Sequence, residues 1–351
     1  MDYSLVDVLV FAPLAPLLGL ILFWFIQLLM IESLKYNMSK IWENHRAFCR
    51  FSNFIGILFQ AIAHATGYTI TGIGVSEFSL SVSESKVSPK KEKKGFPEWI
   101  ANAFLALGPF FIPPFIIFCI LFLIPGVLNV SPVPGYTFSQ MLISFGSLLF
   151  QFGTGFLILL TNLDLLNPFH LSFALLILLV GLGIRPSYIG EEKKKIGMLY
   201  DLHLIKKLIV EHPLYVLITL AVLYLISVIM FLLKIPFYAL LFAFFGWLAL
   251  IAIVAILLAH FVVFLLIISD RLPSFKRFLP FLIPVVSYIA LRILFLAFPS
   301  DFVYSISLLL SILITIASCF VLIKLETNKL KKLSEIKQEE EEDGKGRGDT
   351  S

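Results

Sequence analysis

Hydrophobic blocks about as long as a membrane is thick recur along the whole chain and constrain its fold more than any other feature. Nine such blocks occupy residues 8–31, 54–75, 101–124, 138–160, 169–184, 214–233, 235–268, 278–298 and 303–325. A helix rises 1.5 Å per residue, so about 20 residues cross the ~30 Å hydrocarbon core of a bilayer. Hydrophobic residues make up 59% of the chain and charged residues only 14%, a composition far from that of soluble domains. The sequence therefore predicts an all-α polytopic protein of the cell membrane.

The lysines and arginines between the blocks predict the orientation of the second half of the chain. Segments rich in Lys and Arg face the cytoplasm in most membrane proteins. Residues 185–212, residues 271–277 and the segment after residue 324 are basic, whereas the turns around Lys234 and Asp301 are not. The last four blocks therefore alternate as full crossings, and we expect the C-terminus in the cytoplasm.

The same rule conflicts with simple alternation in the first half. The segments 32–53 and 86–94 are both basic, and 125–137 carries no charge. The conflict disappears if blocks 54–75 and 169–184 are re-entrant, which membranes tolerate where protein buries the segment or it lines a cavity. We therefore expect a helical bundle with seven full crossings, two re-entrant segments and an N-terminus outside the cell.

A motif of potential catalytic character lies in the second block, at Gln60-Ala61-Ile62-Ala63-His64. Residues at i and i+4 share one helix face, and HExxH metalloproteases bind zinc with two such histidines and use the intervening Glu as general base. Residues 75–83 then alternate apolar and hydroxyl side chains, which predicts a short β hairpin after the second block. Leu107-Gly108-Pro109 follows in the third block, and Asp164 interrupts a later one.

This order of motifs resembles the site-2-protease family of intramembrane zinc metalloproteases, over roughly residues 45–184. The resemblance implies that His64 corresponds to the second zinc ligand and Asp164 to the third. It also implies that Gln60 replaces the first histidine and Ala61 the catalytic Glu. The Asn-Pro pair follows Asp164 here, whereas the family has it before its aspartate.

These replacements affect the residues that would bind the metal ion and transfer the proton. A neutral amide is a poor zinc ligand, and an alanine methyl group can neither accept nor donate a proton. The resemblance therefore implies a pseudoprotease, for which we expect no cofactor. Its expected role is to bind membrane segments or a partner protein through a cavity bordered by Gln60, His64 and Asp164.

Two other functions are compatible with the sequence. A divergent active zinc metalloprotease would hold its metal with His64, Asp164 and His170. A transporter or channel would use the interrupted segments and Asp164, since intramembrane carboxylates are often functional. Purely structural roles are the alternative to both functions: Gln60 would form a hydrogen bond between helices, and Asp164 would cap the following helix or lie among the lipid headgroups.

The expected organisation has three parts: a site-2-protease-like module at 1–190, an interfacial helix with a four-helix membrane extension at 191–325, and a charged cytoplasmic tail at 326–351. Apolar residues at helical spacing predict the interfacial helix near 193–211. The acidic and then Gly-rich composition predicts that the tail is disordered at its end. Expected partners are membrane lipids and a membrane protein or transmembrane segment, with no nucleic acid.

Overall fold

The computed structural model describes residues 6–81, 85–91, 94–124, 128–133, 135, 137–184, 198–233, 237–295 and 302–346. The chain divides into two compact units. The first joins Met1–Leu160 to Asp164–Val263, and the second joins Thr161–Leu163 to Phe264–Ser351. The predicted organisation in three parts, with boundaries at residues 190 and 325, stays a prediction.

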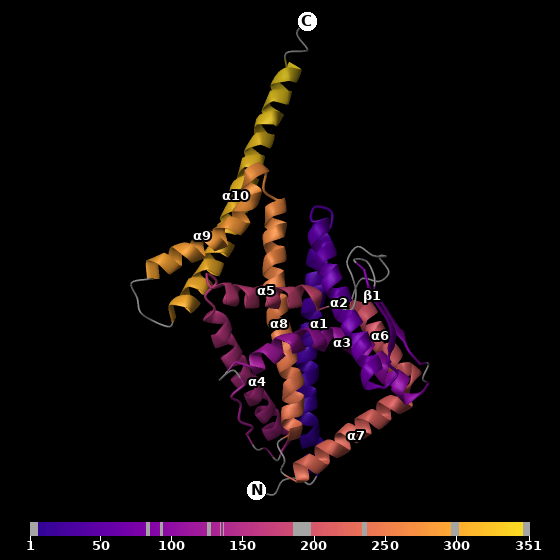
Figure 1. Ribbon diagram of the computed structural model, residues 1–351. Coiled ribbons are helices and arrows are strands. Elements are labelled where there is room, and N and C mark those ends of the chain that lie inside the picture. Colours follow the sequence, from indigo (N-terminus) through magenta and orange to yellow (C-terminus); the bar gives the residue numbers. More distant parts are fainter. Residues whose placement is uncertain are drawn as a thin grey trace. The chain divides into compact units, whose positions relative to one another are not determined.

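Helices make up nearly all of the described chain (Figure 1). In the first unit they are η1 (Asp7–Phe11), η2 (Ala12–Leu14), α1 (Ala15–Ile41), α2 (Arg46–Ile70), α3 (Phe96–Phe122), α4 (Phe138–Thr161), α5 (Pro168–Gly183), α6 (Met198–Glu211), α7 (Pro213–Leu232) and most of α8 (Phe237–Asp270). The second unit contains η4 (Ser274–Phe278), α9 (Leu279–Leu294) and α10 (Phe302–Gly346).

Seven helices of the described chain are long and apolar enough to cross a membrane. They lie at Ala12–Ile41, Phe96–Phe122, Phe138–Thr161, Pro213–Met230, Ala239–Asp270, Ser274–Leu294 and Val303–Ile336. These are the seven segments predicted to cross, so that prediction is confirmed by length and composition. The two segments predicted to be re-entrant, α2 and α5, fall outside this set. With 16 residues, α5 is only about 24 Å long, short of the hydrocarbon thickness.

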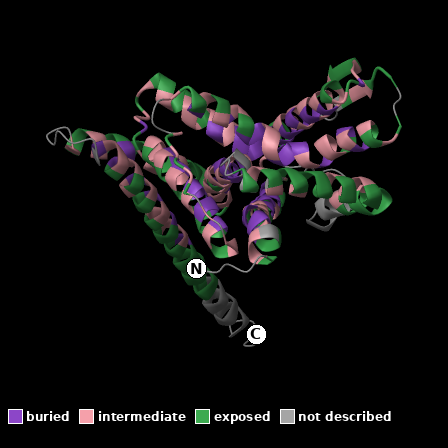
Figure 2. Cartoon of the chain, turned by 90° about the horizontal axis from the view of Figure 1, so that it is seen from below, coloured by how far each residue is buried: buried purple, intermediate pink, exposed green. Residues whose placement is uncertain are grey.

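Apolar side chains cover both the outer faces of the spans and the faces that pack against other helices. On α4, Ile143, Phe150 and Leu157 recur at intervals of seven residues and are 68%, 75% and 58% exposed. The opposite face of α4 buries Phe145 and Phe152. Figure 2 shows buried residues where helices face one another and exposed residues along the outer faces. A helix that is apolar on all sides requires a lipid environment, and the protein is a multi-pass membrane protein.

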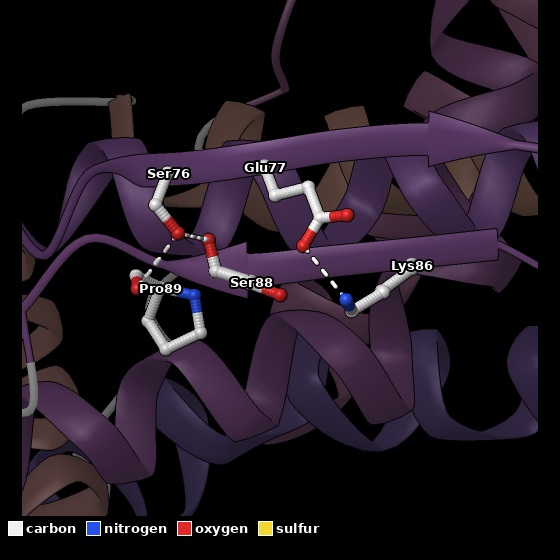
Figure 3. A network of polar contacts seen from close by, with 5 residues as sticks. All are labelled: Ser76, Glu77, Lys86, Ser88 and Pro89. Carbon is white, nitrogen blue, oxygen red and sulfur yellow. Dashed lines mark hydrogen bonds and ion pairs between the residues drawn. The ribbon is translucent and has the colours of Figure 1, made fainter.

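The predicted hairpin is confirmed. Strands β1 (Val75–Leu80) and β2 (Ser85–Pro89) pair antiparallel, with an irregularity at Ser76. The Ser76 hydroxyl donates to the carbonyl oxygens of Ser88 and Pro89, each at 3.1 Å (Figure 3). Lys86 forms a 2.8 Å ion pair with Glu77, and this hydrogen bond and charge raise the pKa of the Lys86 ammonium.

Two charged segments are more helical than the sequence suggested. The basic segment 32–53 is not a loop, because α1 continues to Ile41 and α2 begins at Arg46. An ion pair of 2.5 Å between Lys35 and Glu32, one helical turn apart, lets the 2%-exposed Lys35 side chain enter the protein interior. The tail likewise continues α10 as helix to Gly346, since extending an existing helix needs no new nucleus. Residues 347–351 lie outside the described residues, as do residues 185–197 before α6.

Candidate functional site

The Gln60–His64 motif lies on one face of α2. Gln60 and His64 are half-buried, whereas Ala61 and Ala63 are fully buried. The His64 ring meets the Tyr68 ring edge to face at 6.3 Å, one turn further along the helix. Gln60, His64 and Tyr68 therefore form a polar stripe at i, i+4 and i+8. Ala61, which would have to act on the metal-bound water, is enclosed by packing.

The motif is held by close packing of α2 against α3. A Cβ atom added to Gly108 would lie 2.5 Å from the Ala63 Cβ, and one added to Gly67 would lie 2.8 Å from the Phe104 Cβ. Small residues at such contacts let two membrane helices approach closely. The Gly108-Pro109 segment thus contacts α2 directly beside His64.

Asp164 lies in the turn between α4 and α5. Its Oδ1 accepts a hydrogen bond from the Leu166 N–H at 3.1 Å, and Asn167 Oδ1 accepts from the Phe169 N–H at 2.9 Å. Asn167, rather than Asp164, is therefore the N-cap of α5, a favoured role for asparagine. The sequence correctly suggested a local structural role for this turn but assigned the cap to the wrong residue.

His170 contacts the same turn. Its Nδ1 accepts a hydrogen bond from the Asp164 backbone N–H at 2.9 Å. A backbone N–H can only donate, so Nδ1 carries no proton and the neutral ring is protonated at Nε2. In this geometry neither ring nitrogen offers a free lone pair to a metal ion.

The structure brings Asp164 and His170 together, but α5 separates this turn from the contact with α2. The opposite end of α5 packs on α2, where Ser52 Oγ donates to the Leu182 carbonyl at 3.0 Å. Asp164 precedes the other end of that helix, about 24 Å away along its axis. Within the described residues, no group of three His, Cys, Asp or Glu side chains is placed to hold a metal ion. The three-residue metal site and the cavity bordered by Gln60, His64 and Asp164 stay predictions.

A hydrogen bond that sequence reasoning missed joins α1 to α3. Pro114 has no N–H, so the Phe110 carbonyl loses its partner within the helix. The Gln27 side chain donates to this carbonyl from Nε2 at 3.0 Å, while the Trp24 ring contacts the Phe110 ring edge to face at 5.8 Å. The available signal in the sequence was the Pro113-Pro114 pair in one apolar block together with the amide of Gln27 in another.

Sequence reasoning also missed a polar cavity between the end of α2 and the start of α3. It has a volume of about 410 Å³ and is lined in part by Tyr68, Lys91, Lys94, Glu98 and Asn102. The lysine-rich run before α3 was used only to predict orientation. Its position directly before the aromatic start of a membrane helix was the signal for a cavity.

No protein-family model, curated protein or solved structure matches the chain. The resemblance to the site-2-protease family therefore depends on the motifs and contacts described above.

Proposed function

We propose that this chain is a non-catalytic membrane protein that binds an apolar transmembrane segment of a partner protein. The observation that carries the proposal is a lipid-accessible groove beside α7, and the chemistry of the Gln60–His64 motif supports the absence of catalysis.

The groove lies within the first unit, between the start of α1, α7 and α8. It has a volume of about 610 Å³, and its lining includes Leu17, Leu220, Ala221 and Phe242. None of the α7 span is buried, whereas 33% to 44% of each of the four other spans in this unit is buried. Helix α7 therefore contributes a free face to a concave apolar surface.

A transmembrane helix is an occupant that fits these properties. Lipid tails are as apolar as leucine, so association between membrane helices depends on close packing rather than on hydrophobicity alone. A concave wall with a small residue such as Ala221 offers that packing to a helix. A flat lipid-facing surface such as the outer face of α4 does not.

The non-catalytic half of the proposal follows from residue chemistry. Gln60 presents a neutral amide where the resembled family has a zinc ligand, and Ala61 presents a methyl group where it has a general base. Neither residue can supply the lost function. The packing of Gly108 against Ala63 supports the resemblance in arrangement, because it brings the two motif-bearing helices together.

Site-specific photo-cross-linking in the native membrane tests the proposal. A photoreactive phenylalanine at Leu217, which lines the groove and is 65% exposed, should yield a discrete adduct with one membrane protein. The substitution Ala221→Trp should fill the groove and abolish this adduct. The same probe at Phe150, exposed on α4 outside the groove, should give lipid adducts only. Equal protein adducts at both positions, or an adduct insensitive to Ala221→Trp, would show that the groove is not a binding site.

The divergent metalloprotease is the second candidate, favoured by the contact between Asp164 and His170. It requires His170 to release its hydrogen bond and rotate toward a metal ion. Under this alternative, His170→Ala should abolish proteolysis of a helical substrate. Under our proposal, His170→Ala should leave the Leu217 adduct unchanged.

A further inference from the structure

The polar cavity at the end of α2 has the features of a ligand site and is independent of the groove beside α7. Three elements build it: Tyr68 comes from α2, Lys91 and Lys94 from the segment after β2, and Glu98 and Asn102 from α3. The cavity beside α7 and the cavity beside Phe78 have no charged residue in their linings.

The two lysines are available to a ligand. Within the described residues, neither Lys91 nor Lys94 forms an ion pair, whereas the nearby Lys86 is paired with Glu77. Both lysines are exposed. The cavity therefore combines two unpaired ammonium groups with the amide of Asn102 and the hydroxyl of Tyr68, all of which donate hydrogen bonds.

The cavity lies beside the start of α3, which is one end of a helix long and apolar enough to cross a membrane. Trp99, one turn into α3, stacks on Phe96 at 5.8 Å and lies 6.2 Å from the Tyr215 ring of α7. The Trp99 indole N–H donates to the Leu208 carbonyl of α6 at 3.0 Å. Trp99 is thus buried among α3, α6 and α7, and tryptophan and tyrosine are enriched near the ends of membrane spans. A ligand in the adjoining cavity would meet the phosphate layer of the bilayer.

We propose that this cavity binds the phosphate of an anionic lipid whose headgroup carries hydroxyl groups. Lys91 and Lys94 bind the phosphate, as basic pockets between membrane helices commonly do. Glu98 contributes specificity, because its carboxylate accepts a hydrogen bond from a headgroup hydroxyl. The site should therefore prefer phosphatidylglycerol to phosphatidylmethanol, which carries the same single phosphate charge but no headgroup hydroxyl.

Competition binding with the purified full chain in an uncharged detergent tests this assignment. Fluorescent phosphatidylglycerol is bound first, and unlabelled phosphatidylglycerol, phosphatidylmethanol, phosphatidylcholine or inorganic phosphate is then titrated against it. We expect phosphatidylglycerol to displace the probe best and phosphatidylcholine to displace it least. Displacement by inorganic phosphate as effective as by phosphatidylglycerol would overturn the lipid assignment in favour of a soluble phosphate ligand.

Three variants locate the site. Lys91→Gln with Lys94→Gln should weaken phosphatidylglycerol binding about 30-fold, from the usual contribution of a lysine near a phosphate-bearing surface. Lys331→Gln with Lys332→Gln, which changes the net charge equally on exposed positions of α10, should leave it unchanged. Glu98→Gln should reduce the preference for phosphatidylglycerol over phosphatidylmethanol, because a neutral amide oxygen is a weaker acceptor than a carboxylate. Equal weakening in both lysine pairs would show that general charge, rather than the cavity, binds the lipid, and an unchanged preference in Glu98→Gln would overturn the role of Glu98.

Discussion

The hydrogen bond from Gln27 to the Phe110 carbonyl predicts a specific energetic coupling between two helices. The carbonyl is available because Pro114 cannot donate to it, and Gln27 Nε2 lies 3.0 Å away. Replacing Gln27 with leucine removes the donor and leaves a buried carbonyl without a partner. Hydrogen bonds between membrane helices contribute about 0.6 to 1.7 kcal/mol to stability. We therefore expect Gln27→Leu to lower the free energy of unfolding by about 1 kcal/mol.

The single substitution also removes a second group, which makes a double-mutant cycle necessary. Gln27 Oε1 is buried and has no hydrogen-bond partner among the described residues. Removing an unsatisfied acceptor stabilises the protein, which offsets part of the loss. In Pro114→Ala, the new backbone N–H can bond to the Phe110 carbonyl, so Gln27 is no longer needed there. Gln27→Leu should then cost about 1 kcal/mol less in this background than in the wild type.

Pro113 provides the matched control. Its missing N–H frees the carbonyl of Pro109, which Gln27 does not contact through this bond, so Pro113→Ala and Gln27→Leu should be additive. Reversible unfolding in mixed micelles measures all the required free energies. Additive effects of Gln27→Leu and Pro114→Ala, or equal coupling in the two proline backgrounds, would refute the explanation.

Three further predictions concern packing, capping and buried charge, and each is measured by the same unfolding assay. Gly108→Ala should lower the free energy of unfolding by about 1–3 kcal/mol, because its new Cβ would lie 2.5 Å from a side chain of α2. Gly146→Ala, whose new Cβ would have nothing within 4 Å, should be neutral. Equal effects of the two substitutions would contradict the packing of α2 against α3. Asn167→Ala should lower the unfolding free energy by about 1 kcal/mol through loss of the N-cap, and Asn167→Asp should retain the cap; a neutral alanine variant would exclude this role. Glu32→Gln should lower the free energy of unfolding, because it removes the carboxylate that pairs with the buried Lys35 ammonium. Adding Lys35→Met should restore part of the loss, and failure of that rescue would show that the pair is not the cause.

The spans and the hairpin could be predicted because their signals are local. A run of about 20 apolar residues specifies its own environment, since each residue adds its own transfer free energy. The alternation at residues 75–83 specifies strand geometry in the same way. The exclusion of blocks 54–75 and 169–184 from the set of full crossings also followed from charge placement alone.

What sequence reasoning missed depends on partners distant in the chain. The burial of Lys35 depends on its ion pair with Glu32, which the basic composition of segment 32–53 does not reveal. The role of Gln27 depends on the Phe110 carbonyl of another helix, which lacks a partner there because of Pro114. The expected cavity bordered by His64 and Asp164 stays a prediction, and the contact between Ser52 and Leu182 joins α2 to the end of α5 remote from Asp164. Lys91 and Lys94 were counted only as charges, because their cavity exists only once α2 and α3 lie side by side.

The zinc content of the full chain, purified without chelators and measured by elemental mass spectrometry, tests the central claim of a non-catalytic protein most directly. Under the proposed resemblance, Gln60 and Ala61 stand where the family has a zinc ligand and a general base, so we predict far less zinc than protein, unchanged by His64→Ala. A stoichiometric amount of zinc that is lost in His64→Ala would contradict the account.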